Sequence, residues 1–167
     1  MRWEKYKKYN KEKLLNLQSH KQTHIGTICI EEIDNEVISI KFVQPHKDSI
    51  NSLLAEKAFS QLEDYLQGNL YQFSFPYKLI GTSFQHKVWN SLLQIPYGQT
   101  TSYKDIAIKI GMPKAYRAVG LANNKNPLMI VVPCHRVIGV NGKLVGYAAG
   151  THIKQQLLQL EQVGYNS

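Results

Sequence analysis

Two pairs of polar residues in the second half of the chain constrain its fold most strongly. Thr82 with Gln85, and Ser102 with Asp105, each have the spacing of a capping box. In this motif a hydroxyl and an amide or acid side chain satisfy the free N–H groups that begin a helix. An apolar segment with helical spacing follows each pair. We therefore expect two helices to begin at these points.

The lengths of these helices follow from the residues that end them. The first is expected from Thr82 to about Gln94. Gly111 ends the second, and Pro113 suits the first turn of a third helix, from Lys114 to about Asn123. Two short helices joined by a glycine-containing turn of a few residues match the helix-turn-helix pattern.

The third expected helix is rich in small residues and has basic residues on or beside it. A helix with so little bulk can approach a nucleic-acid groove closely, or it can pack tightly on a neighbouring helix. From this segment alone, packing is the simpler interpretation. The small residues are Ala115, Ala118, Gly120 and Ala122, and the basic ones are Lys114, Arg117 and Lys125.

The first half of the chain has a different pattern. Residues 23–31 and 36–43 are β-branched and partly alternating, and Ile33-Asp34-Asn35 between them suggests a hairpin. A helix is expected over 49–67, with Gly68 as its stop, and a short strand over 71–75. Strands followed by a helix indicate a small α+β domain, and we find no catalytic constellation in it.

We accordingly divide the chain into a supporting domain, residues 1–80, and a mostly helical domain, residues 81–167, of overall α+β class. In the second domain an apolar strand is expected over 128–132, directly before Cys134. A final helix carries Leu157, Leu158, Leu160 and Glu161, with Gly164 as its stop.

Charge is distributed unevenly between the two halves. The net charge of the whole chain is +8, and residues 82–167 alone carry nine Lys or Arg against two acidic residues. Such a field attracts a polyanion to the second half. A basic solvated surface that maintains solubility explains the charge equally well.

Other features exclude several classes of protein. Residues 1–18 are dense in Lys and Glu with no apolar core, and no apolar run is long enough to span a bilayer, so we expect a soluble cytoplasmic protein without membrane contacts. Cys29 and Cys134 are expected to be reduced thiols. Neither lies in a CxxC or HExxH spacing, and we expect no metal site and no cofactor.

Cys134 is the strongest candidate for chemistry. A lone cysteine is more often a small buried apolar residue than a nucleophile. Here His135 and Arg136 follow it directly, and a nearby imidazole or guanidinium lowers the pKa of a thiol from its usual value of about 8.5. The thiolate is the nucleophilic form, so this environment favours attack on an electrophilic carbon.

Pro133-Cys134-His135-Arg136-Val137, together with Ile95-Pro96-Tyr97-Gly98 and Asn126-Pro127, gives the chain a close resemblance to one family. It resembles the O6-alkylguanine-DNA alkyltransferases, also called methylated-DNA–protein-cysteine methyltransferases. The resemblance covers essentially all of residues 82–162, and the first half matches only in size and element order. The Pro-Cys-His-Arg-Val string is highly specific. The matching segments are residues 133–137, 95–98, 101–103, 113–120, Asn126-Pro127 and Gly146-Tyr147, with Lys154 and Glu161 on the last helix.

The resemblance implies a ribonuclease-H-like first domain and a direct-reversal DNA repair enzyme. Cys134 would irreversibly accept the alkyl group from O6 of guanine, once per molecule; activity on O4 of thymine is left open. His135 would be its base through a water molecule, and Glu161 the carboxylate that orients His135. Tyr103 would help to rotate the target nucleotide and protonate the leaving guanine. As isolated residues, His135 and Glu161 are more often structural.

The resemblance also implies a DNA interface and a base pocket. The partner would be double-stranded DNA containing O6-alkylguanine, bound through the minor groove by a monomer. Arg117 would intercalate into the base stack, and Asn126 would tie the recognition helix to the active-site strand. The remaining DNA-binding candidates are Lys114, Ala115, Tyr116 and Arg136, and the remaining pocket candidates are Val137, Tyr147 and Ala148.

Two residues depart from the family pattern. Ala148 often is Ser in the family, so a hydroxyl contact to the base is lost. Tyr116 is bulkier than the usual small residue beside the intercalating arginine.

Three alternative functions remain open at this point. They are a lesion-binding protein that transfers nothing, a helix-turn-helix regulator, and a Cys–His hydrolase.

Overall fold

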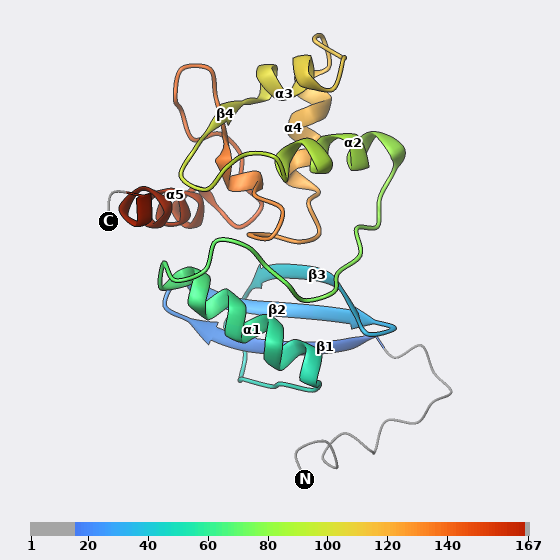
Figure 1. Cartoon of the computed structure of the whole chain (residues 1–167), viewed down its shortest axis with the longest axis vertical. Helices are drawn as coiled ribbons and strands as arrows, with labels where there is room; N and C mark the ends of the chain where they lie inside the picture. The colour runs from blue at the N-terminus through green and yellow to red at the C-terminus, as the bar shows by residue number, and fades with distance from the viewer. Residues whose placement is uncertain (1–15, 166–167) are drawn as a thin grey trace. The chain divides into compact units, whose positions relative to one another are not determined.

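A computed structural model describes residues 16–165 of the chain (Figure 1). The chain forms two compact units, and the boundary falls between Lys78 and Leu79. Within the described residues, no helix has the length and apolar character needed to cross a bilayer. The α+β class expected from the sequence is confirmed.

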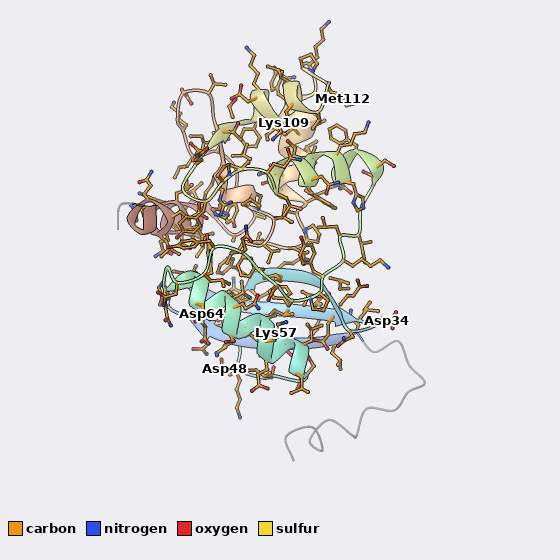
Figure 2. All side chains as sticks on the ribbon, viewed as in Figure 1. Asp34, Asp48, Lys57, Asp64, Lys109 and Met112 are labelled. Atoms are coloured by element: carbon orange, nitrogen blue, oxygen red, sulfur yellow. The ribbon has the colours of Figure 1, made fainter. Side chains whose placement is uncertain are left out.

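The first unit contains one antiparallel sheet of three strands in the order β1 (Leu17–Thr23), β2 (Gly26–Ile33) and β3 (Glu36–Val43). The expected hairpin joins β2 and β3. Its two turn residues, Asp34 and Asn35, have φ angles of 51° and 62°. Positive φ at both central positions is typical of the type I′ turn, whose twist matches that of the strands. Figure 2 labels Asp34 at the tip of this hairpin.

Helix α1 (Leu53–Leu66) lies along the sheet within this unit (Figure 1). The Ser52 hydroxyl accepts a hydrogen bond from the Ala55 N–H at 2.8 Å and begins the helix. The helix starts later than predicted because Ser49 pairs with His20 of β1 through main-chain hydrogen bonds. The core between helix and sheet consists of Ile28, Ile30, Val37, Ile40, Ala55, Ala58, Phe59 and Leu62.

Two predictions for this unit are wrong. Strand β1 was missed except for Thr23, because only Ser19 of its seven side chains is fully buried and no apolar alternation marks it. Pairing with β2 is what makes the segment a strand. The predicted strand over 71–75 is absent. This segment is irregular, and Phe73 and Phe75 pack edge-on with their ring centroids 5.8 Å apart.

The second unit contains the helices α2 (Ser83–Leu92), α3 (Tyr103–Lys109) and α4 (Tyr116–Asn124). Both predicted capping boxes are formed, at the starts of α2 and α3. The indole N–H of the buried Trp89 donates to the Ala122 carbonyl at 2.9 Å and so connects α2 with α4.

Helices α3 and α4 form the predicted helix-turn-helix. Gly111, with φ of 75°, follows α3 as expected. The third helix begins later than predicted. Residues 112–115 form a turn closed by the Ala115 N–H on the Met112 carbonyl at 2.8 Å, and α4 starts only at Tyr116. Lys114 and Ala115 therefore precede the helix. Figure 2 labels Lys109, the last residue of α3, and Met112, which follows the helix.

The predicted buried strand over 128–132 is also wrong. These residues are buried, but the Val132 N–H donates to the Leu128 carbonyl at 2.9 Å and folds the segment back on itself. Ile130 has a φ of 74°, which a β-branched residue adopts only under strain. The apolar run reflects burial, and its periodicity does not distinguish a strand from a buried loop.

The remaining elements frame Cys134. A short 3-10 helix, η2 (Cys134–Arg136), leads into β5 (Val137–Ile138), which pairs in parallel with β4 (Thr101–Ser102). This pairing brings the start of α3 next to the segment that follows Cys134. Helix α5 (Thr151–Tyr165) completes the unit, and it continues through Gly164, so the predicted stop there is wrong.

Candidate active site

Cys134 lies at the start of η2, with a side chain that is 2% exposed. The Asn126 Nδ2 group donates to Cys134 Sγ at 3.1 Å, and Asn123 Nδ2 donates to the Cys134 carbonyl at 3.3 Å. Both asparagines are buried. Asn123 at the end of α4 thus holds the main chain of Cys134, and Asn126, just beyond the helix, holds its sulfur.

Asn126 also explains the shape of residues 128–132. Its Oδ1 accepts from the Leu128 N–H at 2.9 Å, and its Nδ2 donates to the Val132 carbonyl at 2.8 Å. These bonds replace main-chain partners that a strand would need. One amide side chain thus shapes the buried loop and contacts the sulfur at its end.

His135 and Glu161 form a buried pair. His135 Nε2 lies 2.7 Å from Glu161 Oε1, and the two side chains are 0% and 1% exposed. Burial lowers the pKa of His135, and the bond to Glu161 only partly offsets this, so the imidazole is neutral near pH 7. With Glu161 ionised, Nε2 carries the ring proton and donates it. Nδ1 is then the basic nitrogen of the ring.

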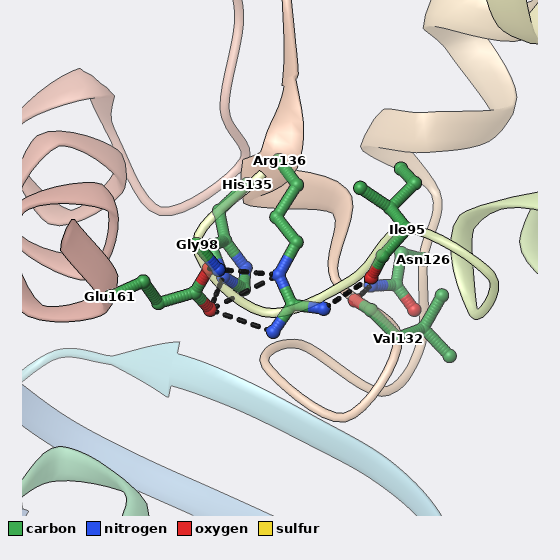
Figure 3. Close-up of polar contacts among 7 residues, drawn as sticks. All are labelled: Ile95, Gly98, Asn126, Val132, His135, Arg136 and Glu161. Carbon is green, nitrogen blue, oxygen red and sulfur yellow. Dashed lines mark hydrogen bonds and ion pairs between the residues drawn. The ribbon is translucent and has the colours of Figure 1, made fainter. Parts of the chain in front are cut away.

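Glu161 is held from several sides (Figure 3). Arg136 donates through Nε at 2.9 Å to Oε2 and through Nη2 at 2.8 Å to Oε1, and the Gly98 N–H donates to Oε2 at 3.1 Å. Burial opposes ionisation, but the hydrogen bonds from His135 and Arg136 outweigh it and hold the pKa of Glu161 well below its usual range. Glu161 is therefore an anion whose position is fixed.

Arg136 corrects one prediction. We expected this residue to contact DNA, but its side chain is buried, bonded to Glu161, and donates through Nη1 to the Ile95 carbonyl at 2.6 Å. Its guanidinium also lies over the Tyr97 ring, 5.6 Å from the centroid. The charge of Arg136 is thus used inside the protein and supports the His135–Glu161 pair.

The environment of the thiol also differs from the one expected. Burial raises the pKa of Cys134, and hydrogen bonds from Asn126 and Tyr147 and the charge of Lys154 lower it by a smaller amount. The pKa of Cys134 is therefore raised, whereas the sequence predicted that it is lowered; His135 is neutral and Arg136 is paired with Glu161.

Three further side chains lie close to one another, those of Tyr103, Tyr147 and Lys154. The Tyr103 hydroxyl donates to the Val145 carbonyl at 3.0 Å, and Lys154 Nζ donates to that carbonyl at 3.3 Å. Lys154 Nζ lies 5.8 Å from the centroid of the Tyr103 ring and 6.0 Å from that of Tyr147. Burial, and the charge of Cys134, raise the pKa of Tyr103, so its hydroxyl keeps its proton.

Helix α4 presents two different faces. Val119, Ala122 and Asn123 are buried, whereas Tyr116 and Arg117 are exposed. The Arg117 guanidinium lies 5.9 Å from the centroid of the Tyr116 ring. The packing interpretation of the small-residue helix is therefore confirmed for one face, and the other face is exposed and carries Arg117.

The other candidates divide between buried and accessible positions. Lys114 is exposed and Ala115 half-buried in the turn before α4. Val137 and Tyr147 are buried, and Ala148 is exposed. Within residues 16–165 there is no group of three or more His, Cys, Asp or Glu side chains arranged to hold a metal ion.

Sequence reasoning missed the main-chain groups of the site. The Ile95 carbonyl accepts from Arg136, and the Gly98 N–H donates to Glu161. The sequence marks the Ile-Pro-Tyr-Gly motif that contains both residues, but not these contacts. Asn123 gave no signal beyond its place at the end of a helix. Lys154 was noticed as part of the resemblance but given no role.

Comparison with known proteins identifies the family. A model described as the 6-O-methylguanine DNA methyltransferase DNA-binding domain matches residues 83–163. The constitutive methylated-DNA–protein-cysteine methyltransferase of Bacillus subtilis is 42% identical over 165 residues, which cover 90% of this chain and 98% of that protein. The chain belongs to the methylated-DNA–protein-cysteine methyltransferase family.

Other members agree with this assignment. The methylated-DNA–protein-cysteine methyltransferase of Methanosarcina barkeri is 54% identical over 112 residues, 67% of this chain and 71% of that protein. The crystal structure of Mycobacterium tuberculosis O6-methylguanine methyltransferase superposes with a TM-score of 0.80 at 39% identity, covering 87% of this chain and 92% of that one. A structure of the Mycobacterium tuberculosis protein in complex with DNA gives a TM-score of 0.81 at 39% identity, covering 88% and 93%.

Proposed function

We propose that this methyltransferase repairs O6-methylguanine in DNA by moving the methyl group to Sγ of its own Cys134. The main support for this proposal is the buried pair of His135 and Glu161, whose side chains are 2.7 Å apart. His135 directly follows Cys134 in the chain. A nucleophile, a base and a group that orients the base are what thiol activation requires. Family membership supplies the substrate.

The proton of the thiol goes to His135. Its Nδ1 takes the proton through a water molecule while Nε2 keeps its bond to Glu161, so the imidazole becomes an imidazolium beside a carboxylate. Glu161 stabilises that charge and fixes the ring orientation. Because burial keeps His135 neutral beforehand, the base is ready at neutral pH.

Methyl transfer then forms one bond and breaks another. The thiolate attacks the methyl carbon, a sulfur–carbon bond forms, and the carbon–O6 bond breaks with its electron pair moving to the guanine. Tyr103, whose hydroxyl keeps its proton, protonates the leaving base. The product is a thioether, which water does not cleave, so each molecule repairs one lesion and requires no soluble methyl donor.

The target base must leave the duplex to reach a sulfur that is 2% exposed. Flipping costs a few kcal/mol, and less for a mispaired damaged base. The base pocket is lined by main-chain groups of Cys134 and Val137 and by Tyr147 and Ala148. The Ala148 N–H remains available to O6 although the hydroxyl of a serine is lost.

DNA binds to the exposed face of α4 through the minor groove. Arg117 enters the base stack and fills the space left by the flipped base. The residues that precede Arg117 also face the DNA, namely Lys114, Ala115 and Tyr116. Lys114 neutralises phosphate charge. The net charge of +7 over residues 82–167 supports this interface. Asn126 connects the end of α4 with the sulfur, so it links the DNA-binding helix to the reacting atom.

Intact-mass measurement after mixing with a duplex oligonucleotide containing O6-methylguanine tests the proposal. We expect the mass of one added methylene, located on Cys134 by peptide mapping, with a stoichiometry of about one per protein. Cys134→Ser should gain nothing and still bind the DNA. Binding without any added mass would indicate a lesion-binding protein and contradict the proposal.

A further inference from the structure

Lys154 is a lysine buried inside the second unit. Its side chain is 0% exposed, and among the described residues Arg136 is the other buried cation. Arg136 is paired with Glu161. Lys154 Nζ instead donates to two main-chain carbonyls, those of Val137 at 2.5 Å and Val145 at 3.3 Å. Its charge therefore faces neutral acceptors.

An ammonium in such a position is costly. Removing a charge from water costs several kcal/mol, and dipoles such as carbonyls offset only part of it. Burial lowers the pKa of Lys154 to about 8, and the charge of Cys134 acts in the opposite direction. At pH 7 the lysine is thus still mostly protonated, and an anion nearby would stabilise it.

The ionisable groups around Lys154 leave one candidate for that anion. Glu161 is neutralised by Arg136, and His135 is neutral. Tyr103, on α3, has a raised pKa and stays protonated. What remains is the Cys134 sulfur. Lys154 Nζ bonds to the carbonyl of Val137, three residues after Cys134, and lies 6.0 Å from the centroid of the Tyr147 ring. The charge of Lys154 lowers the pKa of Cys134, against the larger effect of burial.

We propose that Lys154 is the counter-charge of the Cys134 thiolate. It is a positioning residue, which allows this buried sulfur to ionise and also holds residues 138–144, the loop before the base-pocket residues Tyr147 and Ala148. Its bonds to Val137 and Val145 join the two ends of the segment 138–144, directly before Tyr147 and Ala148. Lys154 keeps its proton throughout, and the proton of the thiol goes to His135. The inference rests on the proposed function, but its tests need no DNA.

The first test measures how Cys134 ionises. The rate of its carboxamidomethylation by iodoacetamide is followed against pH by peptide mapping, so that Cys29 does not interfere. In Lys154→Met, which keeps the length and removes the charge, the midpoint should rise by about one pH unit or more. Lys87→Met, on the exposed side of α2, is the matched control and should leave the midpoint unchanged.

Circular dichroism and thermal unfolding establish that each variant is folded. A folded Lys154→Met protein with the wild-type midpoint would overturn the proposal, because a merely structural lysine changes stability without changing the ionisation of the sulfur. Lys154→Arg retains the charge and, where it folds, should restore most of the wild-type midpoint.

A second test leaves Lys154 in place, so it can be made even if the Lys154→Met variant does not fold. The pKa of Lys154 is measured by NMR on lysine-labelled protein, in the wild type and in Cys134→Ser. Removing the ionisable sulfur should lower the pKa of Lys154 further below about 8. Equal values in the two proteins would overturn the proposal.

These outcomes are separable from those of the repair experiment. If Cys134 gains a methyl group but its titration is independent of Lys154, only the counter-charge is wrong. If Lys154 controls the titration but no methyl group is transferred, the proposed function fails and the counter-charge stands.

Discussion

The Asn126 side chain lies 3.1 Å from Cys134 Sγ, and the same Nδ2 donates to the Val132 carbonyl at 2.8 Å. The residue that shapes the loop before the sulfur is therefore also a hydrogen-bond donor to the sulfur. Such a donor favours the thiolate over the thiol, because a negatively charged acceptor forms the stronger hydrogen bond.

Asn126→Asp should slow alkyl transfer while largely preserving the shape of the side chain. The substitution replaces an N–H donor by a carboxylate oxygen beside the sulfur, so the thiolate loses a bond and meets a like charge. We expect the pKa of Cys134 to rise by about one unit or more, measured by the pH dependence of iodoacetamide modification. Asn90→Asp, on an exposed position of α2, is the control. Equal reactivity of the Asn126 variant and the wild type would contradict this role.

Glu161→Gln should destabilise the protein strongly at pH 7. The variant leaves Arg136 as a buried cation without its anion, which typically costs about 3–5 kcal/mol of the free energy of unfolding. Because the folded-state pKa of Glu161 is lowered, this contribution is complete above the ordinary carboxyl pKa of about 4.3 and is lost as pH falls below it. Urea unfolding of both proteins at several pH values measures this. The difference should shrink by roughly 1–2 kcal/mol at about pH 3, and a pH-independent difference would show that the charge of Glu161 is not responsible.

His135 should titrate below its ordinary pKa of about 6.5. Burial lowers its pKa and the bond to Glu161 raises it, so in Glu161→Gln the pKa should fall further. The unfolded chain takes up this proton at about pH 6.5 and the folded chain only at lower pH, so acidification through that interval destabilises the fold. NMR titration of the imidazole resonances tests both statements, and a pKa at or above the ordinary value would refute them.

Arg117→Ala should slow repair of duplex DNA by about tenfold or more, because the space left by the flipped base is no longer filled. Reaction with O6-methylguanine as the free base should be almost unaffected, since no stack is opened. Single-turnover rates on the two substrates make the comparison, with Lys87→Ala as the control for loss of one exposed positive charge. Equal slowing on both substrates would remove the assigned role.

Trp89→Phe should destabilise the second unit by about 1–3 kcal/mol. The variant loses the indole N–H bond to the Ala122 carbonyl and leaves space beside the buried ring. Urea unfolding measures the loss. Tyr116→Phe, at a side chain that is 46% exposed, should change the free energy of unfolding by less than about 0.5 kcal/mol. A similar effect of both substitutions would contradict the structural role of Trp89.

The features that could be predicted without the fold are local. The capping boxes at Thr82 and Ser102 were predictable because their hydrogen bonds join residues three positions apart. The turn at Asp34-Asn35 depends on residues that tolerate positive φ. The order Pro-Cys-His-Arg-Val likewise predicts a nucleophile and its base without any knowledge of the fold.

Tertiary structure decided the rest, because those interactions join residues far apart in the chain. Arg136 and Glu161 are 25 positions apart, and only their burial together converts a predicted DNA contact into an internal ion pair. Residues 128–132 are apolar enough for a strand, but the Asn126 side chain takes over their main-chain hydrogen bonds. Lys154 is an ordinary lysine in the sequence, and only the folded structure buries it and bonds its ammonium to the carbonyls of Val137 and Val145.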